Sequence, residues 1–158
     1  MIFVNAEMNF LCNLQRRPAE VTTGRNGKMR IQAYLRILST EATIRALHSE
    51  TNVPNASIKQ VKARRGRVGN EVWWNWQTER VSIDVENPDG GFRALLLVHK
   101  PIFRIIKKRQ GPETDIYLEA VTQYERGEEP QGLYLSAETV LLLSEMGGAF
   151  DHDVYSAN

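Results

Sequence analysis

Regular alternation of inward apolar positions with mainly polar ones predicts the first clear element of the chain. From residue 28 to 37, every second position carries an apolar side chain: Met29, Ile31, Ala33, Leu35 and Ile37. Successive side chains of a strand point to opposite faces, so this period of two predicts a strand with one buried face. Residues 115–124, DIYLEAVTQY, repeat the pattern and predict a second such strand, with Ile116, Leu118, Ala120, Thr122 and Tyr124 on one side.

Three segments instead show helical spacing or helix signals. Ser39 or Thr40 can cap a helix that has Ile44 and Leu47 on its inner side and ends by Pro54. Residues 92–106 have apolar residues at helical spacing, with a new start or a kink at Pro101. Near the end, Ser136 can cap a short helix that stops at one of two glycines, and its apolar positions are Val140, Leu141, Leu143 and Met146.

Two further strand regions complete the order of elements. Residues 71–86, EVWWNWQTERVSIDVE, form one region, in which Trp74 and Trp76 share a face and Trp73 takes the other. Residues 150–155 form the last strand. Strands that alternate with helices in this order predict an α+β fold, similar to a split β-α-β unit in its first six steps. We expect an antiparallel or mixed sheet with helices mainly on one face, formed by a single domain of residues 28–158 after an extension or extra strand at 1–27.

Length and cysteine content narrow the class of protein. A chain of 158 residues is long enough for one proper core. Its single cysteine, Cys12, allows no intramolecular disulfide and suits a reducing compartment. The apolar opening lacks a cationic front end and a small-residue cleavage pattern, and no run approaches the ~18–20 apolar residues that span a bilayer. We therefore expect a cytoplasmic protein that is not bound to a membrane.

Charge is divided unevenly along the chain, although the net charge is only +1. Residues 1–109 contain 19 Lys or Arg against 9 Asp or Glu, whereas residues 110–158 contain Arg126 alone against 10 acidic residues. One explanation is that the two parts fold against each other and partly neutralise their charges. The other is an acidic surface that faces a partner, and the sequence leaves both open.

Candidate chemistry is sparse. Asp151, His152 and Asp153 are all possible metal ligands, but in a strand His152 points away from the two carboxylates, so we expect no metal site. His48 and His99 have no zinc-helix spacing around them, and the sequence contains no nucleophile elbow, phosphate loop or dinucleotide fingerprint. We therefore expect no catalytic residues and no cofactor, and a protein that is not an enzyme.

Nucleic-acid binding is the main alternative from the residues themselves. The segment 59–67 is basic, with Arg64, Arg65 and Arg67 near its end, and Trp73, Trp74 and Trp76 follow. Cationic side chains bind phosphates, and flat rings stack on bases at about 1–3 kcal/mol each. The acidic last third opposes this reading, because it repels a polyanion, and alternating tryptophans are more often core or interface anchors.

The arrangement of short motifs resembles a bacterial domain family of unknown function. The matching segments in this sequence are AYLRI, VWWNW, SIDVE, GLYLSAETVLLLSEMGGA and the tail FDHDVY, across about residues 29–155. The resemblance is most specific in the last twenty-five or so residues, and it identifies the tail as the last strand of the domain rather than a metal site. The family brings no established catalytic residues.

Members of the family often occur near bacterial polymorphic toxin genes, so the resemblance implies an immunity protein. Such a protein binds one cognate toxin, here expected to be a basic effector domain, and occludes its active site. An acidic surface on the inhibitor would steer association with a basic toxin, and exposed aromatic rings would anchor it. The expected contact region consists of Glu125, Glu128, Glu129, Asp151, Asp153 and Tyr155.

Overall fold

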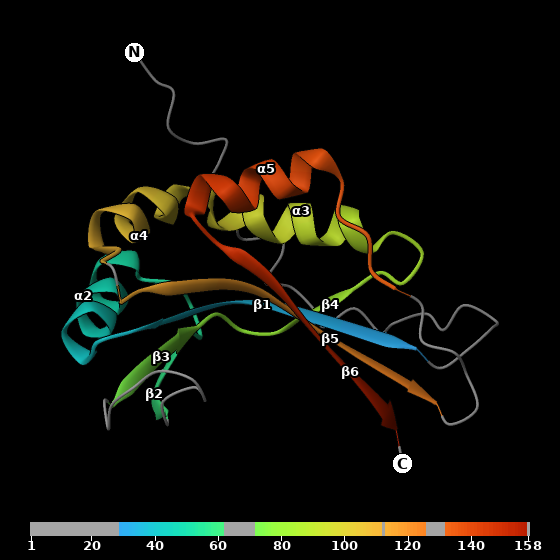
Figure 1. Cartoon of the computed structure of the whole chain (residues 1–158), viewed down its shortest axis with the longest axis horizontal. Helices are drawn as coiled ribbons and strands as arrows, with labels where there is room; N and C mark the ends of the chain where they lie inside the picture. The colour runs from blue at the N-terminus through green and yellow to red at the C-terminus, as the bar shows by residue number, and fades with distance from the viewer. Residues whose placement is uncertain (1–28, 62–71, 112, 126–131, 158) are drawn as a thin grey trace.

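One twisted sheet organises the part of the chain that the computed structural model describes, which is residues 29–61, 72–111, 113–125 and 132–157 (Figure 1). The strand order is β2-β3-β1-β5-β6, and β4 pairs with β1 beside this path. The strands are β1 Arg30–Ser39, β2 Ser57–Val61, β3 Trp73–Gln77, β4 Val81–Ile83, β5 Asp115–Glu125 and β6 Ala149–Ala157. The long central strands β1 and β5 are the two that period-two alternation predicts most clearly.

The sheet is mixed. β1 pairs antiparallel with β3, β4 and β5, and β2 pairs antiparallel with β3, whereas β5 and β6 run parallel. The parallel pair is joined through a helix, and its strands are direct neighbours in the sheet. β3 and β4 lie along the same edge of β1 and are separated at Thr78, whose Oγ1 accepts from Leu35 N at 3.1 Å.

The helices cover one face of the sheet, as Figure 1 shows for α3, α4 and α5. They are α2 Glu41–Thr51, α3 Pro88–His99, the 3₁₀ turn η1 Lys100–Ile102, α4 Phe103–Arg109 and α5 Ala137–Met146. Between helices and sheet lies a core that joins the inner faces of β1 and β5 to Phe92, Leu96 and Met146, each fully buried. Together these observations confirm the α+β class and the placement of helices on one face.

Side-chain caps begin the helices where the sequence predicts them. Thr40 Oγ1 accepts from Thr43 N in α2, and Ser136 Oγ accepts from Thr139 N in α5. The prediction for α3 was wrong by one turn, since the helix begins at Pro88 rather than after Gly91. Asn87 caps it by accepting from Gly90 N, and the fixed φ of a proline suits the first helical position.

Two further features of the structure were not predicted from the sequence. Residues 57–61 form the strand β2. None of its side chains is fully buried, so the sequence of this basic segment shows no alternation that would predict a strand. Of the four apolar positions of α5 named from the sequence, Val140 and Leu141 are 50% and 63% exposed. The other two, Leu143 and Met146, are buried together with Thr139, so the buried side of α5 is narrower than its run of apolar residues.

Gly147 ends α5 in the left-handed conformation, with φ of 71°. A Cβ at this position would lie 3.0 Å from Gln110 Nε2 and would meet the steric penalty of positive φ. We expect Gly147→Ala to lower the free energy of unfolding by about 1 kcal/mol in urea titrations. Gly111→Ala is the control, because no atom lies within 4 Å of its added Cβ, and equal losses in the two variants would contradict this account.

Candidate partner-binding surface

The last strand, β6, presents two chemically different faces. Phe150 and His152 face the core: the Phe150 ring centroid lies 5.6 Å from that of Phe92, and His152 Nε2 lies 2.9 Å from Thr122 Oγ1. Burial lowers the pKa of His152 and outweighs the opposite effect of the carboxylates of Asp153 and Asp151. As alternation predicts, His152 therefore cannot join those carboxylates around one ion.

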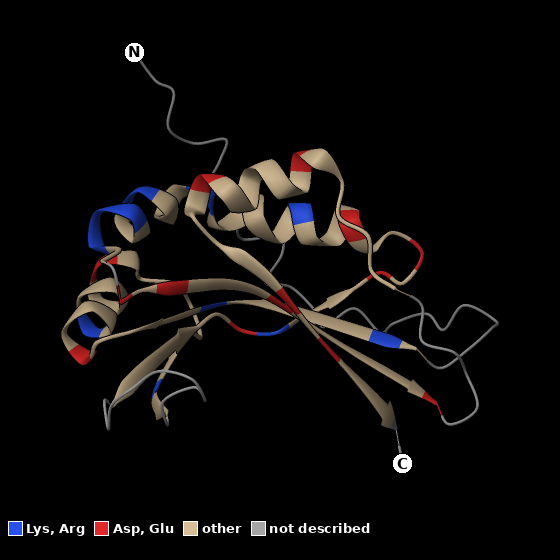
Figure 2. Cartoon of the chain, in the orientation of Figure 1, with Lys and Arg blue, Asp and Glu red and all other residues tan. Residues whose placement is uncertain are grey.

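The other face of β6 carries Asp151, Asp153 and Tyr155, and the parallel register extends this surface onto β5. Asp151 lies beside Glu119, Asp153 beside Val121 and Tyr155 beside Gln123. Glu125 ends β5 on the same face, because it is an even number of residues from Glu119. We call Glu125, Asp151 and Asp153 the acidic strip; Figure 2 shows red segments on both strands.

Exposure differs along this surface. Asp153 is exposed and Tyr155 is 52% exposed, whereas Asp151 and Glu125 are half-buried. Glu125 and Asp151 also interact with other groups of the chain, so the most available acidic group is Asp153. Four of the six expected contact residues thus lie on one face in the structure, of which Glu125 was not predicted to do so, and Glu128 and Glu129 lie outside the described residues.

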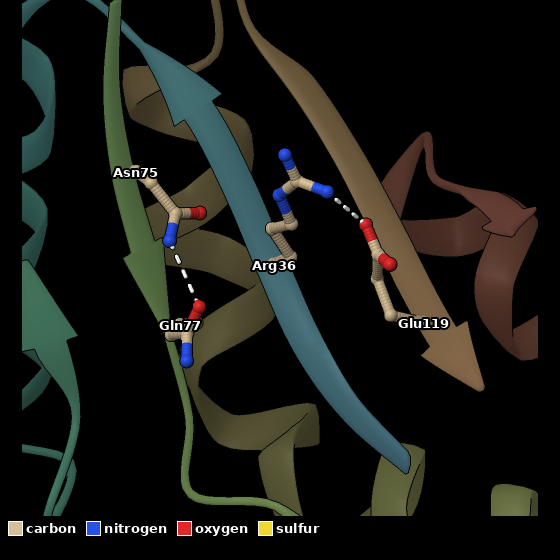
Figure 3. A network of polar contacts seen from close by, with 4 residues as sticks. All are labelled: Arg36, Asn75, Gln77 and Glu119. Atoms are coloured by element: carbon tan, nitrogen blue, oxygen red, sulfur yellow. Dashed lines mark hydrogen bonds and ion pairs between the residues drawn. The ribbon is translucent and has the colours of Figure 1, made fainter. Parts of the chain in front are cut away.

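Glu119 does not contribute its charge to the strip, because it forms an ion pair with Arg36 of β1 (Figure 3). The Arg36 guanidinium donates from Nη1 to Glu119 Oε1, and the side chains are 30% and 2% exposed respectively. A carboxylate this deeply buried needs a cation and hydrogen bonds to offset its lost hydration. The alternation of apolar and polar residues did not predict this ion pair. The charged residues at positions 36 and 119, inside two long and mostly buried strands, could have indicated it.

The remainder of this face, opposite the helices, is a polar and aromatic network. Arg80 Cζ lies 4.8 Å from the Tyr34 ring centroid. Burial, with the negative charge of Glu119, raises the pKa of Tyr34 despite the cation of Arg80. On β3, Asn75 donates to Gln77 Oε1 at 2.9 Å (Figure 3). On the side that carries the acidic strip, the Arg36–Glu119 pair therefore joins β1 to β5 and Arg80 contacts β1, whereas the Asn75–Gln77 hydrogen bond lies within β3.

The tryptophans predicted as alternative nucleic-acid contacts mostly serve the core. Trp76 is fully buried, and Trp74 packs against the core with Arg45 Cζ 5.0 Å from its ring. Trp73 takes the opposite face, as predicted, but it is only 7% exposed, so its ring is not available for base stacking in this structure. Trp73 lines a pocket of about 250 Å³ together with Thr40, Val72 and Glu113.

Other candidate chemistry can be placed only in part. Arg64, Arg65, Arg67 and Cys12 lie outside the described residues, as does the extension predicted for residues 1–27. Within the described ranges, no three His, Cys, Asp or Glu side chains come close enough together to hold a metal ion. Over the same ranges, none of the helices combines the length and apolar character needed to cross a bilayer.

Comparison with known proteins places the chain in a family. Neither the curated proteins nor the solved structures gave a significant match. A match to a family of domains covers residues 29–157, which include every strand and helix described above. These bounds begin one residue before β1 and end with β6, so the family corresponds to the fold described above. The chain therefore belongs to the family described as Domain of unknown function (DUF4279).

Proposed function

We propose that this chain is an immunity protein, which binds a cognate bacterial toxin domain in the cytoplasm and blocks its active site. The observation that carries the proposal is the acidic strip, because it gathers Glu125, Asp151 and Asp153 on one face next to the exposed ring of Tyr155. The resemblance to domains encoded near toxin genes supports the choice of partner. In this role the protein acts by binding and needs no catalytic group or cofactor of its own.

Electrostatics supports a basic partner. Complementary charge steers diffusional encounter and suppresses wrong partners, and an exposed aromatic ring supplies contact area at small entropic cost. Toxin domains that act on nucleic acids or nucleotides are commonly basic around their active sites, so an acidic strip fits the surface that must be covered. Tyr155, at 52% exposure, is the aromatic group best placed to anchor the contact.

Capture of the partner tests this proposal. Tagged protein is used to isolate binding proteins from the source organism, in parallel with a variant carrying Glu125→Gln, Asp151→Asn and Asp153→Asn. A control variant removes three exposed charges elsewhere through Glu86→Gln, Glu113→Gln and Glu138→Gln. The captured protein is then expressed with and without this chain, and bacterial growth is measured.

We expect one protein to be retained by the original chain and by the control variant, with affinity lowered at least tenfold in the acidic-strip variant. Expressed alone, that protein should arrest growth, and co-expression of the original chain should restore it. The proposal fails if the captured protein is harmless, or if both triple variants bind it equally well. Salt-sensitive capture of nucleic acid by all three proteins would favour the alternative, in which the basic segment 59–67 is the contact.

A further inference from the structure

Among the described strands, none pairs with the outer edge of β6. In the sheet order β6 is terminal, and among the described strands only β5 pairs with it. The strand is nine residues long, and its register with β5 continues without a bulge from Ala149 to Ala157. Such an edge offers a row of backbone N–H and C=O groups to any extended segment that approaches it.

The two terminal strands of the sheet differ in how well they are protected. Edge strands are usually kept from pairing by shortness, lysine, proline or bulges. β2, at the opposite end, has five residues and an exposed Lys59. β6 has nine residues and neither lysine nor proline, and Val154 and Tyr155 are 42% and 52% exposed. Its only charged side chains that could discourage pairing are the carboxylates of Asp151 and Asp153.

Those carboxylates select the kind of strand that can be added. If two copies of β6 paired antiparallel in full register, Asp153 would lie opposite Asp153 of the second copy, and like charges directly opposite are destabilising. A strand with Lys or Arg opposite Asp153 would gain a cross-strand pair instead. The charge pattern therefore disfavours a second copy of this chain and favours a basic partner.

We infer that the outer edge of β6 binds an extended, basic segment of the partner protein as an added strand of the sheet. Backbone hydrogen bonds along the edge would supply affinity, and the carboxylates would supply selection for Lys and Arg. This inference rests on the proposed function, because it states how the toxin is held next to the acidic strip. It also predicts where the contact lies: the partner segment runs along the outer edge of β6 and does not only cover the face of the sheet.

Synthetic peptides test the edge directly. The probe has nine residues of alternating lysine and valine; a second peptide has the same sequence with every backbone nitrogen methylated, and a third replaces lysine with glutamate. Binding to the full chain is measured by fluorescence anisotropy, and amide hydrogen exchange is followed in β6 and β2. Methylation keeps the charge and removes the hydrogen-bond donors, so it separates strand pairing from simple electrostatic attraction.

We expect the lysine peptide to bind at least tenfold more tightly than either other peptide, and to slow amide exchange in β6 at least tenfold without affecting β2. Asp153→Lys should reverse the preference between the lysine and glutamate peptides. Equal binding of the methylated peptide, no binding of the lysine peptide at millimolar concentration, or protection away from β6 would overturn the inference.

The same exchange measurement on the complex with the captured toxin keeps the two proposals distinguishable. Binding that depends on the acidic strip without new protection in β6 would leave the immunity function standing and remove strand addition from it. Peptide binding at the edge, combined with capture of no toxin, would have the opposite meaning. In that case β6 remains a strand-binding edge and the immunity function fails.

Discussion

Replacing Arg36 with methionine is expected to lower the free energy of unfolding by about 3 kcal/mol, close to the lower end of what breaking a buried ion pair costs. Methionine keeps much of the apolar stem of the arginine but removes the cation and the donor to Glu119 Oε1. The Glu119 carboxylate is then left 2% exposed, without its guanidinium. Arg36 is itself 30% exposed, so water can reach the Glu119 carboxylate and partly solvate it. The expected loss of unfolding free energy therefore stays near the lower end of the range for buried ion pairs.

Urea unfolding of two further variants separates the effect of charge from that of packing. Lys100→Met removes a surface pair with Glu145, whose atoms lie 3.6 Å apart and whose side chains are about half exposed, so we expect a loss below about 1 kcal/mol. Glu119→Leu combined with Arg36→Met removes both charges, and most of the stability should return. If Arg36→Met lowered the free energy of unfolding no more than Lys100→Met does, the Arg36–Glu119 pair would contribute only as much as a surface ion pair, and the prediction would be wrong.

The same pair shows where sequence reasoning stops. Alternation identified the inner faces of β1 and β5, because burial on one side forces apolar residues into every second position. It said nothing about partners on the other face, where Arg36 and Glu119 meet from residues 83 apart in sequence. Pairing register decides such contacts, and register depends on tertiary structure as well as on local pattern.

The sequence predicted helix ends most accurately where a single residue type determines the local geometry. Thr40 and Ser136 cap their helices, and Gly147 takes positive φ, so these boundaries were predictable from residue type. The strand β2 was not, because it carries no fully buried position and therefore no periodic signal. The start of α3 was misjudged because Gly90 and Gly91 suggest a turn. In the structure both glycines lie in the first helical turn, where Asn87 accepts from Gly90 N and Gly91 packs closely against Ile83.

The candidate site followed a similar division. The period of β6 predicted that Asp151, Asp153 and Tyr155 share a face, and the structure adds Glu125 from β5 through the register. The terminal position of β6 among the described strands could not be foreseen, because strand order is a property of the whole sheet. Whether the acidic strip meets a partner stays a prediction, which the capture experiment addresses.

Acidification from pH 7 to 5 is expected to destabilise the protein by about 2 kcal/mol through His99 alone. Burial lowers the pKa of His99 to about 4, from a usual value of 6.5. Between those two values the unfolded chain binds a proton that the folded chain does not, so stability is present at neutral pH and is lost as the pH falls from 6.5 toward 4. The lowered pKa of His152 acts in the same direction.

Histidine variants assign this pH dependence to individual side chains. Urea unfolding at pH 7, 6 and 5 should give a shallower loss of stability for His99→Gln than for the original chain, and a further reduction when His152→Gln is added. His48→Gln is the matched control, because it makes the same replacement at a histidine that is exposed at the surface. Asp89 does not confuse the result: burial raises the pKa of its carboxyl, but hydrogen bonds from Ser136 and Thr139 outweigh burial and keep that pKa below 3.8. An unchanged slope in His99→Gln would show that the folded protein accommodates the charged imidazole at the end of α3, and would remove burial as the cause.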